Sequence, residues 1–348
     1  MSYNTIKVLV VDDAAFMVKA LTEMLSSDPQ LEVVGVARNG QEAREKIPEL
    51  RPDVITLDVD MPVMDGIRTV RHLMIESPVP VIMLSSLSGD GAITFEALRL
   101  GVVDFVPKPS GAVSRDISSA KQEVIDRIKM AASVDMKNIH RVRLQQRDIQ
   151  DDALSGQYGF QALEQLVVVG TTLGGPNTLI RLLTQLSPKL PISLVVSQKI
   201  NPKVIDSFVS KFNEYVPWRI EVAKDGEILE QGVCYIAPDK TSIRIGENEE
   251  EEICLQLGEE VEQPLNELFT SAAYAFGNNT IGLLLAGIGD DGAKGLGDIQ
   301  SMGGKTIAQA INSYVTPNLT DNAINEGTVD HVVEESDLPA QIESLING

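Results

Sequence analysis

Short apolar runs alternate with amphipathic stretches over the first 110 residues of the chain. The stretches, such as Ala15–Ser26 and Gly40–Leu50, repeat apolar residues at helical spacing. Because strands that alternate with helices form parallel βαβ units, this half predicts a parallel sheet with helices on both faces. The apolar runs predict its five strands at Val8–Val11, Val33–Val36, Val54–Leu57, Val81–Leu84 and Phe105–Val106.

The pattern changes after residue 110. The segment Ile117–Ala132 predicts one amphipathic helix, with Val124, Ile125 and Ile128 at helical spacing. A polar stretch of mixed charge follows, from Asp135 to Gly159. We interpret residues 116–162 as a linker that separates a domain over residues 1–115 from a second one over residues 163–348.

The alternation of strands and helices returns from Leu166. A helix is expected from about Pro176, and an acidic tip at Gly246–Glu252 predicts a hairpin between Thr241–Ile245 and Ile253–Leu257. This half predicts a larger, doubly wound and mostly parallel α/β domain. Its buried strands are expected at Leu166–Val169, Ile192–Val196, Val233–Ile236, Ile281–Ala286 and Thr306–Ala308.

Composition limits the possible partners and the location. A formal net charge of −21 argues against binding to nucleic acid and to anionic membranes, because both need a basic surface. The two cysteines form neither a disulfide framework nor a zinc motif. The chain opens without a signal-peptide pattern and contains no apolar run near 18 residues. We therefore expect a cytoplasmic protein without direct membrane insertion.

Acidic residues follow two of the predicted strands in the first half. Asp12 and Asp13 come after the first strand, and Asp58 comes after the third. The carboxyl ends of parallel strands meet at one edge of a sheet, where these carboxylates would repel one another unless a cation such as Mg²⁺ lay between them. One carboxylate could then accept a phosphoryl group. Ser85 and Lys108, after the fourth and fifth strands, would complete such a pocket.

These positions resemble the receiver domains of response regulators, through VLVVDDAAFM, TLDVDMPVMDG, VIMLSSL and DFVPKP in order and spacing. The resemblance implies a flavodoxin-like fold. It implies that Asp58 accepts the phosphoryl group and that a histidine kinase donates it. The other implied roles are Mg²⁺ binding by Asp12 and Asp13 with the Asp60 backbone, phosphoryl binding by Ser85 and Lys108, and a switch at Phe105.

The second half contains two glycine-rich turns after predicted strands. The turn Gly170-Thr171-Thr172-Leu173-Gly174-Gly175 places Thr172 where a strand–turn–helix motif exposes a nucleophile. The segment Gly287–Gly292 brings carboxylates to the same sheet edge. Each turn alone is a weak signal, because glycine marks tight turns in general.

Together with the receiver motifs, the second half resembles the chemotaxis protein-glutamate methylesterase (CheB) family. The resemblance runs through VVVGTTLGG, VVSQKINP, KDGEILEQGVCYIAP, LLLAGIGDDGAKG and KTIAQ. It implies a Ser-His-Asp triad, held off by the unphosphorylated receiver. It also implies action on methyl-accepting chemoreceptors, whose glutamyl methyl esters are hydrolysed and whose glutamines are deamidated.

The triad carries over with two departures. Asp291 keeps the aspartate, whereas Thr172 stands for the serine and Lys199 for the histidine. The family pattern also changes at Ile288, at Asp290 and at Gln263-Pro264-Leu265. The methyl group of threonine crowds attack, and lysine acts as a base only when it is neutral, which nearby carboxylates oppose. In a serine protease, loss of the nucleophile or of the base alone costs about a millionfold in turnover.

Three functional interpretations follow. We favour a phosphorylation-controlled response regulator with an impaired methylesterase site that acts through binding. The first alternative is a working hydrolase in which Lys199 activates Thr172. The second is a DNA-binding regulator, which the acidic composition and the lack of a helix-turn-helix pattern oppose.

Overall fold

The chain forms two compact units, Met1–Val142 and Arg143–Gly348, in a computed structural model. No helix among the described residues is both long enough and apolar enough to cross a bilayer. The structure describes residues 5–85, 91–108, 117–134, 136, 163–172, 175–198, 200, 202, 204–237, 241–287, 289–310 and 318–347.

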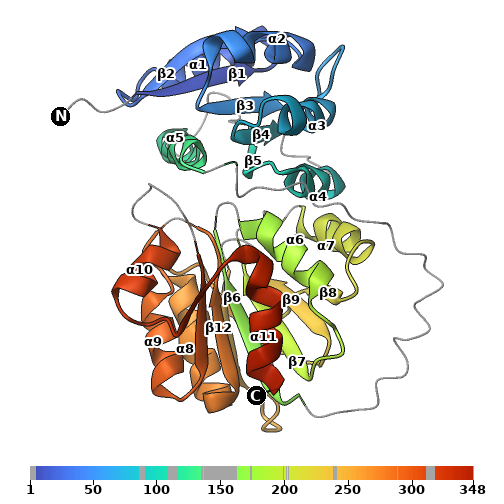
Figure 1. Cartoon of the computed structure of the whole chain (residues 1–348), viewed down its shortest axis with the longest axis vertical. Helices are drawn as coiled ribbons and strands as arrows, with labels where there is room; N and C mark the ends of the chain where they lie inside the picture. The colour runs from blue at the N-terminus through green and yellow to red at the C-terminus, as the bar shows by residue number, and fades with distance from the viewer. Residues whose placement is uncertain are drawn as a thin grey trace. The chain divides into compact units, whose positions relative to one another are not determined.

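The first unit contains a five-stranded parallel sheet in the order β2-β1-β3-β4-β5, seen at the top of Figure 1. The five strands expected from the apolar runs are therefore confirmed. The elements of this unit are β1 (Ile6–Val11), α1 (Ala15–Leu25), β2 (Leu31–Ala37), α2 (Gly40–Leu50), β3 (Val54–Asp58), α3 (Gly66–Glu76), β4 (Val81–Ser85), α4 (Gly91–Leu100), β5 (Asp104–Pro107) and α5 (Ile117–Ala132).

Alternate residues of β1 serve two separate hydrophobic cores. Leu9 and Val11 belong to the core on one face of the sheet, and Val8 and Val10 to the core on the other. This alternation follows from the two-residue repeat of a strand, and it explains why the strands are apolar throughout.

Helix α5 belongs to this first unit, although the sequence placed it in the linker. The apolar positions that predicted the helix, Val124, Ile125 and Ile128, are buried in the same core as Val8 and Val10. An ion pair between Arg127 and Asp104 adds a link to β5, with N and O atoms 2.8 Å apart. Burial of the apolar stripe therefore attaches this helix to the sheet.

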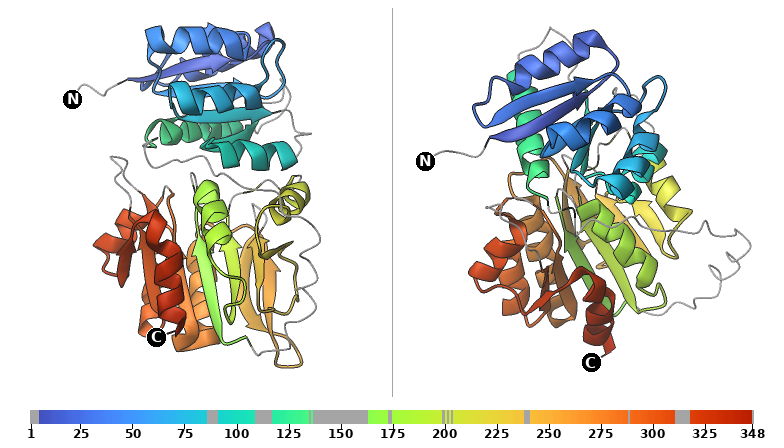
Figure 2. Two further views of the ribbon diagram at one scale, coloured as in Figure 1. Left: turned by 45° about the vertical axis from the view of Figure 1, so that its right-hand side comes forward. Right: turned by 45° about the horizontal axis from the view of Figure 1, so that its top comes forward.

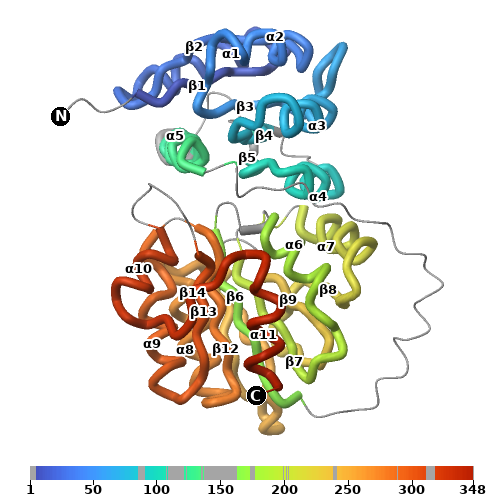
Figure 3. The backbone as a smooth tube through the Cα atoms, viewed as in Figure 1, coloured from blue at the N-terminus to red at the C-terminus, as the bar shows by residue number. Residues whose placement is uncertain are grey.

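The second unit is built on a seven-stranded parallel sheet in the order β14-β13-β12-β6-β7-β9-β8. Figure 3 labels every strand except the hairpin. The elements are β6 (Gln165–Gly170), α6 (Gly175–Gln185), β7 (Ile192–Ser197), α7 (Ile205–Asn213), β8 (Arg219–Val222), β9 (Val233–Ala237), β10 (Ser242–Glu247), β11 (Ile253–Gly258), α8 (Pro264–Phe276), η2 (Gly277–Asn279), β12 (Thr280–Leu284), α9 (Ala293–Ser301), β13 (Lys305–Gln309), α10 (Leu319–Asn325), β14 (His331–Val333), η3 (Glu335–Asp337) and α11 (Leu338–Asn347).

Helices cover both faces of this sheet, so the doubly wound architecture is confirmed (Figures 1 and 2). Helix α8 packs Leu268 and Phe269 into a core with Val168 of β6 and Val195 of β7. The predicted hairpin is also present, as the antiparallel pair β10–β11.

Each sheet reverses its strand order at one position. In the first unit the chain leaves β1 toward β2 on one side and β3 on the other. In the second unit β6 lies between β12, which leads to β13 and β14, and β7, which leads to β9 and β8. Crevices that bind ligands form at such reversal points, outside the carboxyl ends of the strands. The fold therefore directs attention to the segments after β1 and β3, and after β6 and β12.

Candidate functional site

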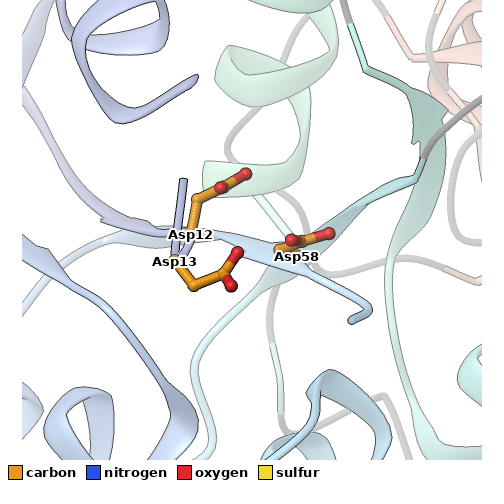
Figure 4. A group of neighbouring side chains, drawn as sticks. All are labelled: Asp12, Asp13 and Asp58. Atoms are coloured by element: carbon orange, nitrogen blue, oxygen red, sulfur yellow. The ribbon is translucent and has the colours of Figure 1, made fainter. Parts of the chain in front are cut away.

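Three carboxylates meet at the reversal point of the first sheet. Asp12 and Asp13 follow β1 and Asp58 ends β3, and one oxygen from each lies within 4.8 Å of the others. Figure 4 shows the three side chains gathered at the ends of these strands. Asp12 and Asp58 are buried, whereas Asp13 is exposed. Among the described residues, this is the one group of three such side chains spaced to hold a metal ion.

Lys108 bridges the two buried carboxylates. Its Nζ lies 2.9 Å from Asp12 Oδ2 and 2.7 Å from Asp58 Oδ2. Burial alone would lower the pKa of Lys108, but the two carboxylates outweigh burial and the pKa is raised. Burial also raises the pKa of Asp58, and Asp12 adds to this effect while Lys108 opposes it. The pocket therefore keeps a fixed positive charge beside a carboxylate whose ionised form is disfavoured.

The donor set suits a hard divalent cation. Carboxylate oxygens are the ligands that Mg²⁺ prefers, and an exposed Asp13 leaves one side open to water ligands. Asp12 Oδ2 is buried beside Lys108 Nζ, and a carboxylate oxygen can accept from more than one partner, so a cation could bind next to the lysine. The acidic pocket is typical of Mg²⁺ binding.

The other receiver residues lie on neighbouring strands of the same sheet. Ser85 ends β4 and pairs in register with Pro107 of β5, directly before Lys108. Phe105, in β5, is half-buried and packs against the core of Leu9. Only the backbone of Ser85 is described, so its predicted phosphoryl contact stays a prediction, as does the switching role of Phe105.

Thr172 lies at the reversal point of the second sheet, two residues after the end of β6. It is half-buried and faces the β12–α9 loop, which we define as residues 285–292. A Cβ atom added to Gly287 in this loop would meet Thr172 Oγ1 at 2.5 Å and the Thr172 backbone N at 2.9 Å. Position 287 therefore has to be glycine, and its absent side chain lets the loop touch the candidate nucleophile.

Asp291 ends this loop and caps a neighbouring helix. Its Oδ2 accepts a hydrogen bond from the Leu265 backbone N at 2.8 Å, and its Oδ1 accepts one from the Asn266 backbone N at 3.0 Å. These two N–H groups belong to the first turn of α8, where the side chain of the N-cap residue Gln263 accepts no capping bond from the backbone. The carboxylate thus replaces the missing cap and also faces the positive end of the helix dipole.

The first turn of α8 caps α9 in return. Asn266 Oδ1 accepts a hydrogen bond from the Gly295 backbone N at 2.8 Å, and α9 has no cap of its own at Gly292. Helices α8 and α9 approach closely here, because a Cβ on Gly295 would lie 2.6 Å from Phe269 Cβ. The two helix N-termini therefore stabilise each other through Asp291 and Asn266.

The electrostatics of Asp291 reflect this position. Burial raises its pKa and the charge of Asp290 adds to the rise, while three backbone N–H groups oppose it. Asp290 itself is exposed. Lys199 and Ile288 lie outside the described residues, so the predicted contact between Lys199 and Asp291 stays a prediction.

No histidine among the described residues lies at this edge. His72 is in α3 of the first unit, and His331 opens β14. Strand β14 is three positions from β6, roughly 14 Å at the usual spacing of strands. The third histidine of the chain, His140, lies outside the described residues.

Sequence reasoning missed three polar residues that organise the edge, namely Asn266, Thr171 and Gln309. Thr171 and Gln309 directly follow or end an apolar strand and are only 1% and 5% exposed. A polar residue in that position is a usable signal, because a buried polar group needs a partner. The identity of the partner depends on strand order, which the sequence does not supply.

The geometry defines a class of protein: a receiver-type acidic pocket on one α/β unit, and a parallel α/β unit with Thr172 and Asp291 near the carboxyl ends of its central strands. Known families agree with both parts. The pattern of the response regulator receiver domain matches residues 8–115, and that of the CheB methylesterase matches residues 167–342.

Individual relatives match almost the whole chain. A protein-glutamate methylesterase/protein-glutamine glutaminase from Geobacillus kaustophilus is 38% identical over 352 residues, which is 99% of both chains. One from Pyrococcus horikoshii is 34% identical, over 97% of this chain and 92% of its own. The response regulator domain of Thermotoga maritima CheB is 48% identical over 38% of this chain and 98% of its own, with a TM-score of 0.35. This chain therefore belongs to the CheB family of chemotaxis response regulators, with a receiver and a methylesterase domain.

Proposed function

We propose that this protein is a phosphorylation-controlled member of the family whose hydrolytic site is impaired and whose output is binding to chemoreceptors. The receiver would accept a phosphoryl group on Asp58 from a histidine kinase. The methylesterase domain would bind a methylated or amidated receptor segment. The relatives are named for acting on protein glutamate methyl esters and protein glutamines.

The ion-pair geometry of the acidic pocket supports the receiver half of this proposal. Asp58 Oδ2 lies next to the ammonium group of Lys108. Asp12 and Asp13 would hold Mg²⁺ beside Asp58. When bound, the metal would neutralise charge on the incoming phosphoryl group. Lys108 would bind a phosphoryl oxygen. Its ion pairs with Asp12 and Asp58 support this role, because they bring its ammonium from the end of β5 to the end of β3.

The residues at the two positions that the resemblance assigns to the reacting groups support an impaired site. Thr172 stands where the family has the serine nucleophile, and Lys199 stands where it has the histidine base. Asp291 remains, but its two oxygens already accept hydrogen bonds from helix α8. The retention of Asp291 is thus explained by helix capping, without any catalytic role.

One observation favours the alternative, a working Thr172–Lys199 hydrolase. Gly287 keeps the β12–α9 loop in contact with the Thr172 hydroxyl, which is where donors to an oxyanion would be needed. Attack by Thr172 Oγ1 on the ester carbonyl would require Lys199 to be neutral, so the rate should rise with pH.

Methanol release from methyl-esterified chemoreceptor membranes tests both versions. Purified protein would be assayed with and without a small-molecule phosphodonor, beside Thr172→Ala, and receptor binding would be measured by co-sedimentation. We expect binding that increases with phosphodonor and release no faster than that of Thr172→Ala. Release that depends on phosphodonor and disappears in Thr172→Ala would replace the proposal with the hydrolase alternative.

A further inference from the structure

The backbone pairing of β12 with β6 ends at Leu285, the first residue of the β12–α9 loop. The last backbone bond to β6 runs from Leu285 N to Gly170 O, at 2.9 Å. At Ala286 the described residues of the two neighbouring strands supply no backbone partner. Two buried side chains take over instead, one from each flanking strand.

Both backbone polar atoms of Ala286 are held in this way. Its N–H donates to Gln309 Oε1 at 2.8 Å, and its carbonyl accepts from Thr171 Oγ1 at 2.9 Å. Gln309 ends β13 and Thr171 directly follows β6, the two strands on either side of β12. The backbone N of Thr171 in turn donates to Ser197 O of β7, at 3.2 Å. Four strands are therefore linked through the backbone of one residue.

The next residue is Gly287, which touches Thr172. Because residues 286 and 287 share a peptide bond, the position of Ala286 determines how closely the loop approaches the Thr172 hydroxyl. On the far side, the Gly287 carbonyl accepts a hydrogen bond from Leu319 N at 3.0 Å. Displacements near 1 Å in such a site are enough to change binding or rate strongly.

We propose that Thr171 and Gln309 are positioning residues that clamp the backbone of Ala286 and thereby fix the β12–α9 loop against Thr172. They touch no reacting group themselves. The inference rests on the proposed function only where it assigns this edge to receptor binding. The clamp itself is independent of whether the edge hydrolyses anything.

Amide hydrogen exchange of the full-length protein tests the clamp directly. In Thr171→Val the hydroxyl is lost at constant shape, and we expect amides in residues 285–292 to exchange about fivefold faster or more, the effect of one lost hydrogen bond. Gln309→Met should release the Ala286 amide in particular. Thr171→Ser keeps the hydroxyl and should restore the protection seen in the wild type.

Thr280→Val is the matched control. Thr280 is equally buried, and its Oγ1 donates to Ala272 O at 3.1 Å, but it lies at the opposite end of β12. We expect this variant to lose similar global stability without faster exchange in the loop. Equal loop exchange in Thr171→Val and Thr280→Val would overturn the clamp, because the effect would then be general destabilisation.

Co-sedimentation with methyl-esterified receptor membranes separates this inference from the proposed function. If the wild type binds, Thr171→Val should weaken binding about fivefold or more while Thr280→Val leaves it unchanged. Unchanged binding in Thr171→Val despite faster loop exchange would overturn the positioning role. If the wild type does not bind, the proposed function fails, and the loop exchange alone decides whether the clamp exists.

Discussion

The candidate residues of the two units lie at equivalent points of their sheets, but their carboxylates have different kinds of partner. In the receiver, the carboxylates of Asp12 and Asp58 meet the ammonium of Lys108, and a cation would complete the pocket. In the methylesterase domain, the carboxylate of Asp291 meets only backbone N–H groups among the contacts described for it. The carboxylates of the first site could still bind a cation, whereas the oxygens of Asp291 in the second site already accept hydrogen bonds from the backbone.

This difference shows that a carboxylate at the edge of a sheet can have a structural role of its own. A cluster of like charges is costly to keep without a function, because the charges repel and lose solvation. A carboxylate that caps a helix stabilises the fold by itself. The intact receiver pocket is thus a stronger sign of activity than the intact aspartate of the second domain.

Restoring both replaced groups should produce the largest effect. We expect Thr172→Ser combined with Lys199→His to release methanol from methylated receptor membranes at least about a hundredfold faster than the wild type, given the cost of losing either group in a serine protease. Thr172→Ala combined with Lys199→His is the control that lacks a nucleophile. If the wild type released methanol as fast as the Thr172→Ser and Lys199→His double variant, the hydrolytic site would not be impaired.

Phosphorylation should depend fully on one carboxylate of the receiver. In Asp58→Asn, incorporation from a small-molecule phosphodonor and Mg²⁺ should fall to background, as measured by intact mass. Asp53→Asn is a suitable control, because Asp53 precedes the other end of β3 and accepts a bond from Lys7 N. Persistent labelling in Asp58→Asn would mean that another residue is the acceptor.

Asp291 should prove structural. We expect Asp291→Ala to lower the free energy of unfolding of the second domain by about 2 kcal/mol, since a helix cap is lost and two N–H groups lose their partner. Asp291→Asn keeps an acceptor oxygen and should cost less. Urea unfolding checks both, with Asp290→Ala, an exposed neighbour, expected within about 0.5 kcal/mol of the wild type. No loss in Asp291→Ala would leave catalysis as the reason for this residue.

Substitution of Asp58 should have the opposite effect on stability to substitution of Asp291. Its pKa is raised by burial, so its ionised form is disfavoured in the folded state at neutral pH. Without Mg²⁺, Asp58→Asn should therefore stabilise the receiver by on the order of 1 kcal/mol at neutral pH. The gain should shrink as the pH falls through the raised pKa, because wild-type Asp58 then becomes neutral. Unfolding curves at several pH values, with and without Mg²⁺, provide the measurement, and a gain that grows on acidification would contradict the assignment.

Much of the fold could be predicted because its strands are local signals. Continuous apolar runs such as Val8–Val11 and Ile192–Val196 indicate strands buried on both faces, and both are strands in the structure. The short edge strands β8 and β14 were missed. They carry polar and charged residues such as Arg219 and His331, because an edge strand is only partly buried.

By itself, the sequence determined which chemical groups the protein carries and which strand each of them follows. Asp12, Asp58 and Lys108 could be assigned to one pocket, because the carboxyl ends of parallel strands always share an edge. Only the tertiary structure decided that Asp291 caps α8 and that Thr171 and Gln309 hold Ala286. These contacts join residues between 23 and 115 positions apart. They depend on which strands and helices become neighbours, and that order is set by how the whole chain buries its apolar faces.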